Sequence, residues 1–318
     1  MNITILVKLV IDLYYIYCYR FIVNSKISLV VPVFNESKEI DNFFSDLKDC
    51  NFNLINEIIF INDCSLDNSY ELLKKRIKEF KIEPFKINFI LLNNSKNRGY
   101  GFSIKKGVDK SNNDSIAIID LDRTYKIEDL NNIANQFINV HELEYDLISG
   151  QRKIDVTNTS RLKIFGKAII NMITNFCFNE KIVDYNSGLR IFNKSKFLKH
   201  SHMMSNRFSL TTSMTINFLN ENYEIRFHKI RYDERTGQSK LKFQDFFKFL
   251  YTIFSLLFYY KPFKILVPLI LPLFLAFIFF LIQDIFSGNL TDKTVLLFNF
   301  NFLSIILLFI IDRINKLK

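Results

Sequence analysis

The 318-residue sequence has little cysteine, glycine and proline, and it contains no tryptophan. The spacing of its few cysteines matches neither close disulfide pairing nor metal ligation, which argues against a disulfide framework and a zinc site and agrees with a reducing compartment; they are Cys18, Cys50, Cys64 and Cys177. Internal repeats and low-complexity linkers are also lacking. The net charge of +10 comes from dispersed basic residues without a nucleic-acid-binding signature. An anionic lipid surface and phosphate groups explain this charge better than nucleic acid.

Two long segments near the C-terminus lack charge. Residues 265–282 contain no charged side chain, and residues 295–311 are interrupted only by Asn299, Asn301 and Ser304. Each segment nearly matches the ~20 residues that a bilayer span requires. Neither shows the polar stripe of a surface helix, so we expect a two-helix transmembrane hairpin rather than two buried core helices.

Basic residues flank the two open ends of this hairpin, whereas the connecting loop at 283–294 holds two aspartates and one lysine. The positive-inside rule therefore predicts a multi-pass membrane protein with both ends, and the preceding domain, in the cytoplasm. Residues 1–24 are apolar but carry Lys8, Asp12 and Arg20, and they lack a small-residue cleavage site. We interpret them as an interfacial or packed amphipathic segment, not as a signal peptide.

Between residues 26 and 150, short β-branched runs alternate with stretches of helical length. This rhythm predicts a mostly parallel sheet covered by helices. Strands are expected at 27–33, 57–61, 87–92, 115–119, 146–149 and 223–230. Helices are expected at 38–47, 68–80, 100–110, 127–140 and in a segment that ends at 178. Residues 243–260 form a predicted amphipathic helix before Pro262.

The most informative motif is Ile118-Ile119-Asp120-Leu121-Asp122, an apolar run that ends in two carboxylates. In an extended segment, residues i and i+2 face the same side, so Asp120 and Asp122 would project together from the carboxyl end of a strand, where open α/β sheets bind ligands. Mg²⁺ and Mn²⁺ prefer such oxygens and share them with substrate phosphates. Two solvated loop acids are the alternative, and the neighbouring motifs decide against it.

Three other predicted strand ends carry polar groups or glycines that would reach the same edge. Residues 31–36, Val-Pro-Val-Phe-Asn-Glu, could surround a nucleotide base and ribose, or could stop a strand and cap a helix. Asp63 could accept hydrogen bonds from a base, while Asp67 is better placed to cap the next helix. Gly99 and Gly101 would allow a ligand to approach the backbone, or would form a flexible turn. Four such strand ends are hard to attribute to coincidence.

Together with Gly150-Gln151-Arg152, Asp-Tyr-Asn-Ser-Gly-Leu-Arg at 184–190 and Gly237-Gln238-Ser239-Lys240, these motifs resemble the family-2 glycosyltransferases of the GT-A fold. Within that family they are similar to the polyprenyl-phosphate, or dolichol-phosphate type, sugar transferases. The resemblance implies an α/β fold with a Rossmann-like, mostly parallel sheet and flanking helices. It divides the chain into an N-terminal segment at 1–24, a GT-A catalytic domain at 25–240, a juxtamembrane amphipathic helix at 241–262 and a transmembrane hairpin with a basic tail at 263–318.

The resemblance further implies an enzyme that transfers a sugar from a nucleotide-diphosphate sugar to a polyprenyl phosphate at the cytoplasmic membrane face, with inversion. The implied donor-binding residues are Pro32, Phe34, Glu36, Asp63, Arg98, Gly99, Asp120 and Leu121. The implied ligands of Mg²⁺ or Mn²⁺ are Asp120, Asp122 and Thr124. The residues assigned to the acceptor and its phosphate are Arg152, Arg161, Ser187, Arg235 and Lys240. The catalytic residues are expected to be Asp122, Asp184 and Arg152.

The sequence departs from the family pattern at two sites. Leu121 replaces a small residue, and Arg123-Thr124-Tyr125 follow the acid pair where the family often has Leu-Gln or Gly-Gln. Phe165 stands where related enzymes can place a serine near the acceptor phosphate, so arginines would form more of that site. Because a phosphate oxygen is already anionic near neutral pH, we interpret Asp184 as an orienting or electrostatic group, or as a helix cap, rather than as a required base.

Two other functions remain open. A membrane-anchored transferase that adds sugar to a hydroxyl of a glycan or lipid-linked saccharide would need Asp184 as a base. Processive synthases carry a Gln-x-x-Arg-Trp motif, which this tryptophan-free chain lacks. A non-enzymatic membrane scaffold with a degenerate fold is the second alternative, and the intact Asp120 and Asp122 argue against it. The expected partners are the sugar nucleotide, the lipid phosphate and the membrane, without nucleic acid, and self-association is left open.

Overall fold

The computed structural model describes residues 26–80, 83–139, 145–152, 171–180, 182–233 and 243–316. The chain divides into two compact units. The first comprises Met1–Asp155 with Val183–Phe249, and the second comprises Val156–Ile182 with Leu250–Lys318. The amphipathic segment predicted at 1–24 lies outside the described residues, and so do Arg161, Phe165, Arg235 and Lys240.

The first unit is built on a seven-stranded sheet in the order β3-β2-β1-β4-β6-β5-β7. All strands run parallel except β6, which lies antiparallel between β4 and β5. The predicted mostly parallel sheet is therefore confirmed, and each predicted strand overlaps an observed one. The strands are β1 (Ile27–Val33), β2 (Ile55–Asn62), β3 (Asn88–Asn93), β4 (Ser115–Ile118), β5 (Leu147–Arg152), β6 (Arg190–Asn193) and β7 (Ile225–Ile230).

Helices cover both faces of the sheet because successive side chains along each strand point to opposite sides. Leu29 and Val31 of β1 pack into one core with α2, α3 and α5, whereas Val30 packs into another with α4, α7 and α8. These helices are α2 (Ile40–Asp46), α3 (Ser69–Glu79), α4 (Tyr100–Lys110), α5 (Ile127–Asn139), α7 (Lys194–His200) and α8 (Leu210–Asn220), with the short 3-10 helices η1 (Leu47–Asp49) and η2 (Ser201–Met203).

The sequence prediction missed β6, α7 and α8. Strand β6 contains only two apolar residues, Ile191 and Phe192, between Arg190 and Asn193, and so gives no apolar run. Helix α8 shows no apolar stripe because nearly all of its residues are buried, hydroxyl-bearing ones included. Ser213 Oγ donates to the carbonyls of Ser209 and Leu210 at 2.9 Å, and Thr215 Oγ1 donates to the carbonyl of Thr211 at 2.9 Å. Such bonds within the helix satisfy the buried hydroxyl groups.

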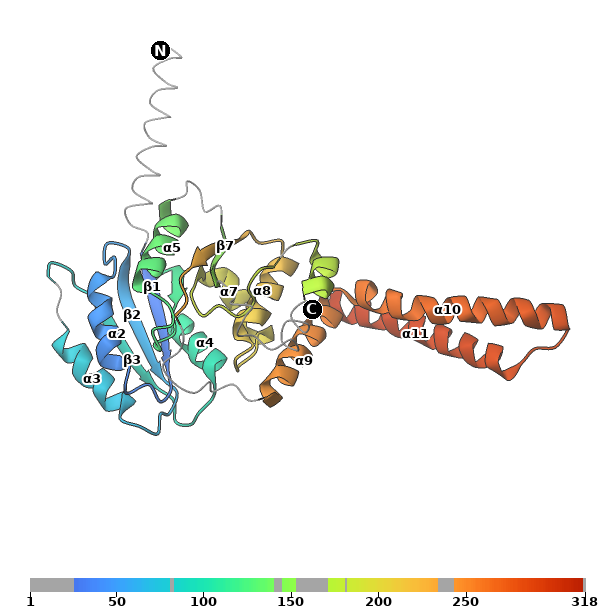
Figure 1. The fold of residues 1–318 in the computed structure, drawn as a ribbon, viewed down its shortest axis with the longest axis horizontal. Helices are drawn as coiled ribbons and strands as arrows, with labels where there is room; N and C mark the ends of the chain where they lie inside the picture. Colours follow the sequence, from blue (N-terminus) through green and yellow to red (C-terminus); the bar gives the residue numbers. More distant parts are fainter. Residues whose placement is uncertain are drawn as a thin grey trace, which may run out of the picture. The chain divides into compact units, whose positions relative to one another are not determined.

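The second unit contains the C-terminal part of α9 (Phe243–Tyr260), α10 (Pro262–Ser287) and α11 (Asp292–Lys316). Helices α10 and α11 run side by side as the predicted hairpin (Figure 1). By length and composition, both could cross a membrane. Gly288, with φ 67°, ends α10, and Asp284 accepts a hydrogen bond from the Thr291 backbone N–H at 2.7 Å, which closes the turn. Asn301 of α11 donates to the carbonyl of Leu273 in α10 at 3.3 Å.

The sheet topology determines which motifs meet. Carboxyl ends of parallel strands lie at one edge, and β6 runs in the opposite direction, so its amino end reaches that same edge. Arg190 at the start of β6 pairs with Ile118 of β4 and with Ser149 of β5. The segment at 184–190 therefore lies beside the acid pair. Strand order changes direction between β1 and β4, which is the switch point where open α/β sheets bind ligands.

Candidate active site

The acid pair lies just beyond the end of β4. Residues 121–124 form a turn, so strand alternation does not orient Asp122 as the extended conformation predicted. Two contacts hold the turn instead. Leu121 is buried in the core, and Asp122 Oδ1 accepts hydrogen bonds from the backbone N–H of Thr124 at 3.2 Å and from its hydroxyl at 2.7 Å. The buried Thr124 thus orients Asp122, and its role as a metal ligand stays a prediction.

Arg123, between Asp122 and Thr124 in the chain, has the left-handed backbone conformation, with φ 59°. That conformation costs an ordinary residue about 1–2 kcal/mol. Its guanidinium reaches Asp46 at the end of α2, with Nε 2.6 Å from Oδ2 and Nη2 3.2 Å from Oδ1. The ion pair offsets part of the backbone cost and fixes the turn that carries Asp122.

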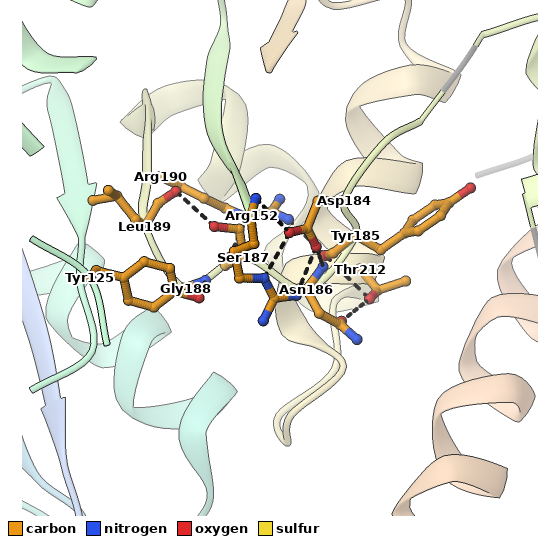
Figure 2. A network of polar contacts seen from close by, with 10 residues as sticks. All are labelled: Tyr125, Arg152, Asp184, Tyr185, Asn186, Ser187, Gly188, Leu189, Arg190 and Thr212. Carbon is orange, nitrogen blue, oxygen red and sulfur yellow. Dashed lines mark hydrogen bonds and ion pairs between the residues drawn. The ribbon is translucent and has the colours of Figure 1, made fainter. Parts of the chain in front are cut away.

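Gly188 lies directly against Asp120. A Cβ added at Gly188 would be 2.2 Å from Asp120 Oδ2 and 2.7 Å from its Cγ. The backbone N–H of Gly188 donates to the Tyr125 hydroxyl at 2.7 Å (Figure 2). Burial raises the pKa of Tyr125 and of Tyr100 well above the ordinary value, and the nearby Asp120 carboxylate raises both further. Asp120 is thus enclosed by a glycine and two phenol side chains, and no larger residue fits at Gly188.

Arg152 and Asp184 face each other in a bidentate ion pair (Figure 2), with Nε 2.7 Å from Oδ2 and Nη2 2.8 Å from Oδ1. The backbone N–H groups of Arg152 and Asn186 also donate to this carboxylate, at 3.2 and 3.0 Å. Burial by itself would raise the pKa of Asp184, but the hydrogen bonds and charge of Arg152 hold it below the ordinary value. The ring of Tyr232 lies 5.2 Å from the Arg152 guanidinium. Arg152 and Asp184 therefore neutralise each other's charge.

Arg190 is completely buried and forms hydrogen bonds with the segment at 184–190 and with α8. Its guanidinium donates to the carbonyls of Ser187 at 2.9 Å and Tyr185 at 2.7 Å. It also donates to the hydroxyl of Thr215 in α8 at 2.7 Å. Burial lowers the pKa of Arg190 to about 10. Ser187, predicted to bind the acceptor, is also fully buried, and its hydroxyl donates to the carbonyl of Leu189 at 3.4 Å. These contacts fasten the segment to α8.

The motif that follows β1 is bonded to the loop that follows β2. Asn35, with φ 53°, accepts a hydrogen bond from the Leu66 backbone at 2.7 Å, and the backbone N–H of Glu36 donates to the Ser69 hydroxyl at 2.9 Å. The three predicted donor-binding residues of this motif lie at or just past the end of β1, each partly exposed: Pro32, Phe34 and Glu36. Their proximity to the switch point agrees with a nucleoside site, which stays a prediction.

Asp63, just beyond the end of β2, is buried, with 4% of the residue exposed. Both of its carboxylate oxygens accept hydrogen bonds. Oδ1 accepts from Asn94 Nδ2 and from the Arg98 backbone, each at 2.8 Å, and Oδ2 accepts from the Gly99 backbone at 2.7 Å. Gly99 has φ 98°, a conformation that glycine tolerates best. In this structure Asp63 holds the turn that begins α4, and its contact with a base stays a prediction.

The sequence prediction missed Arg207 and Phe208. They lie in a segment that covers the turn at Gly99, where the prediction expected the close approach of a ligand. The two glycines were a signal that something approaches the backbone there, but nothing local in the sequence indicates that the chain itself does so.

The acid pair fits a divalent cation that takes further oxygens from a diphosphate. Among the residues that the structure describes, no three histidine, cysteine, aspartate or glutamate side chains cluster as metal ligands. Two carboxylates are the usual protein contribution to a Mg²⁺ site that is completed by substrate. At Gly188 the lack of a Cβ leaves space for the Asp120 carboxylate itself, so this glycine permits the position that Asp120 takes.

Comparisons with known proteins agree with this architecture. The family model for Glycosyl transferase family 2 matches residues 28–201, more than half of the chain. The chain is 28% identical, over 181 residues, to the UDP-N-acetylglucosamine--dolichyl-phosphate N-acetylglucosaminyltransferase of Methanococcus voltae, which covers 53% of this chain and 70% of that protein. It is 29% identical, over 110 residues, to the Dolichyl-phosphate beta-glucosyltransferase ALG5A of Trichomonas vaginalis, which covers 32% of each.

Solved structures share the fold. Glucosyl-3-phosphoglycerate synthase from Mycobacterium tuberculosis in complex with phosphoglyceric acid superposes with a TM-score of 0.56 at 10% identity, over 73% of this chain and 80% of that one. The same synthase in complex with Mn²⁺, UDP and glucosyl-3-phosphoglycerate gives 0.56 at 11% identity, over the same shares. The predicted GT-A fold and enzyme class are confirmed, and the named relatives support the polyprenyl-phosphate type of sugar transferase. The chain belongs to glycosyl transferase family 2 and is a glycosyltransferase.

Proposed function

We propose that the protein transfers a sugar from a nucleotide-diphosphate sugar to a polyprenyl phosphate at the cytoplasmic face of a membrane, with inversion at the anomeric carbon. Three findings support this proposal. The relative from M. voltae is named for a UDP-sugar donor and a dolichyl-phosphate acceptor. The synthase that shares the fold is described in complex with Mn²⁺ and UDP. Two apolar helices follow the sheet domain.

The state of Asp184 supports a phosphate acceptor over a sugar hydroxyl. A hydroxyl must lose its proton during transfer, which calls for a base whose pKa lies near the working pH. Asp184 accepts four hydrogen bonds, three of them from Arg152, and its pKa is held below the ordinary value, so it is a weak base. A phosphate monoester, with a second pKa of about 6, is already anionic and needs no such base. This observation favours the polyprenyl phosphate over the glycan alternative.

In this mechanism Asp120 and Asp122 would hold Mg²⁺ or Mn²⁺. When bound, the metal would offset the negative charge that develops on the leaving diphosphate. Thr124 orients Asp122 through its hydroxyl, and the Gly188 backbone packs against the Asp120 carboxylate. Asp184 and Arg152 act as an ion pair that fixes the segment at 184–190 next to the acids. The nucleoside is proposed to bind to Pro32, Phe34 and Glu36 at the end of β1 and to Asp63 at the end of β2.

Arg161, Arg235 and Lys240 are proposed to hold the acceptor phosphate, since guanidinium and ammonium groups suit phosphate oxygens. The hairpin at 263–318 and the helix at 241–262 are proposed to keep the catalytic domain at 25–240 beside the cytoplasmic leaflet. A lipid headgroup would then reach the site without leaving the bilayer, and the anchor would act through proximity.

The test incubates the full chain in membranes with labelled nucleotide sugars and undecaprenyl or dolichyl phosphate, and then extracts the lipid. We expect label in the lipid, loss of transfer in Asp122→Asn with its fold retained, and normal transfer in Asp109→Asn, which removes an exposed carboxylate on α4. Label found only in water-soluble polymer would favour a glycan acceptor. Normal turnover of Asp122→Asn with added Mn²⁺ would contradict the metal role.

A further inference from the structure

The segment at 204–209, which we call the 204–209 arm, lies on the turn that begins α4. A Cβ at Gly99 would be 2.6 Å from Arg207 Cδ, and a Cβ at Gly101 would be 2.3 Å from the carbonyl oxygen of Ser205. The arm is also bonded to α4, because Lys105 Nζ donates to the Met204 carbonyl at 2.6 Å. Because Gly99 and Gly101 have no side chains, the 204–209 arm can pack directly on the backbone at the start of α4.

The 204–209 arm extends the wall around Asp120. The ring of Phe208 stacks on the ring of Tyr100, with centroids 6.3 Å apart and planes 11° from parallel. The hydroxyl of Tyr100 is buried next to the Asp120 carboxylate. Phe208 remains 48% exposed. The arm thus presents an open aromatic surface and, next to it in the chain, the exposed Arg207.

The charges around the site indicate what Arg207 can bind. Phosphoryl oxygens are held best by guanidinium groups that no protein carboxylate already neutralises. Arg123 and Arg152, which border the acid pair in sequence or in space, are paired with Asp46 and Asp184. Arg207 forms no ion pair within the described part of the chain, and its guanidinium donates to the side-chain oxygen of Asn97 at 3.2 Å. An exposed arginine with a neutral partner retains its full charge for a ligand.

Arg98, which precedes Gly99 in the chain, adds a second exposed charge. Its guanidinium lies 4.6 Å from the ring centroid of Phe102, and among the described residues it has no carboxylate partner. The two arginines thus flank a turn whose backbone is fixed by Asp63. Two guanidinium groups next to this turn suit a group that carries negative oxygens.

We propose that Arg207 binds a phosphoryl group of a substrate, either the diphosphate of the sugar nucleotide or the phosphate of the lipid acceptor, and that Phe208 forms the wall beside it. The proposal rests on the proposed function for the choice of substrates. Because Arg152 is neutralised by Asp184, Arg207 of the 204–209 arm would supply the positive charge that binds the phosphoryl group. Its test measures binding alone, so that it does not depend on turnover.

The test compares the dissociation constants of UDP with Mn²⁺ and of farnesyl phosphate, measured by calorimetry on the full chain in detergent. Arg207→Met keeps the aliphatic contact with Gly99 but removes the charge, and it should weaken at least one ligand about ten- to a hundredfold. Arg207→Lys should lose less. The matched control is Arg226→Met, because Arg226 on β7 also bonds a neutral partner, Tyr145, and its loss should leave both constants unchanged.

Each outcome decides the proposal. Weaker binding of UDP assigns Arg207 to the donor, and weaker binding of farnesyl phosphate alone assigns it to the acceptor. Unchanged constants for both ligands in folded Arg207→Met, equal losses in Arg226→Met, or no binding of either ligand by the wild-type chain would overturn it. Arg207→Gln serves the same comparison should Arg207→Met fail to fold. If both ligands bind but no sugar reaches lipid in the transfer assay, the proposed function fails while the role of Arg207 stands.

Discussion

Gly188→Ala tests whether the position of Asp120 controls transfer. The new Cβ would lie 2.2 Å from Asp120 Oδ2, 2.7 Å from Cγ and 3.0 Å from Oδ1, whereas ordinary contact begins at 3.4 Å. The carboxylate must therefore shift by about 1.2 Å, because the opposing atom is a rigid Cβ on the backbone. Gly188 is not among the residues with a positive φ, so alanine meets no backbone strain there. The contact alone accounts for the effect.

A shift of this size in a metal ligand has a large expected cost. Misplacing a catalytic group by ~1 Å can lower the rate about 100-fold, which corresponds to about 2.7 kcal/mol of transition-state stabilisation. We expect Gly188→Ala to lower kcat by about that factor and to raise the Mn²⁺ concentration for half-maximal activity. Formation of lipid-linked sugar is measured against Mn²⁺ concentration, and Mn²⁺ binding in the presence of UDP is measured by electron paramagnetic resonance.

The matched control is Gly288→Ala in the turn between α10 and α11. No atom lies within 4 Å of a Cβ there, but φ is 67°, so alanine is strained by about 1–2 kcal/mol without touching the site. It should keep the wild-type rate and Mn²⁺ dependence. The reasoning is refuted by a folded Gly188→Ala variant that transfers sugar at the wild-type rate with the same Mn²⁺ dependence.

Three further predictions concern stability and reactivity. Asp184→Asn leaves the partly buried Arg152 without the buried carboxylate that neutralises it and should lower the free energy of unfolding by about 3 kcal/mol, measured by calorimetry. The pKa of Asp184 is lowered in the folded state, so its contribution is present above the carboxyl group's unfolded pKa of about 4 and is lost as pH falls through the lowered folded pKa. Asp184→Asn should lack this acid-dependent loss, and an identical pH profile in both proteins would contradict the ion pair. Glu57→Gln places an amide donor in a buried network of hydroxyl and amide donors at the amino end of β2, so the urea midpoint should fall by the equivalent of about 1–3 kcal/mol. UDP binding at the opposite edge should stay unchanged, and an unaltered midpoint would show that the network adds no stability. Burial raises the pKa of the Cys50 thiol to about 12, whereas Cys64 is partly exposed, so iodoacetamide at pH 8 should label Cys64 first by mass spectrometry. Equal labelling of the two thiols in the folded protein would count against this burial.

Local patterns in the sequence predicted most of the elements. Strand β1, helix α4 and helix α9 span the predicted residues, because β-branched runs, glycine before a helix and apolar periodicity act within a few residues. The hairpin could be predicted for the same reason, since a segment without charged residues is a local property of the sequence. The strand-end positions of Asp63 and Asp120 followed from those elements. Helix α8 was not readable, because its hydroxyl groups are satisfied inside the helix and conceal its burial.

The sequence by itself determined that a mostly parallel α/β sheet would carry an acid pair at one edge and be followed by an apolar hairpin. Only the tertiary structure decided the partners of the site residues: Gly188 against Asp120, Arg152 with Asp184, and the 204–209 arm on the turn at Gly99. The first two contacts depend on the antiparallel insertion of β6 between β4 and β5, which brings the segment at 184–190 to the acid pair. That insertion is set by long-range burial of both sheet faces, and no short-range pattern in the chain encodes it.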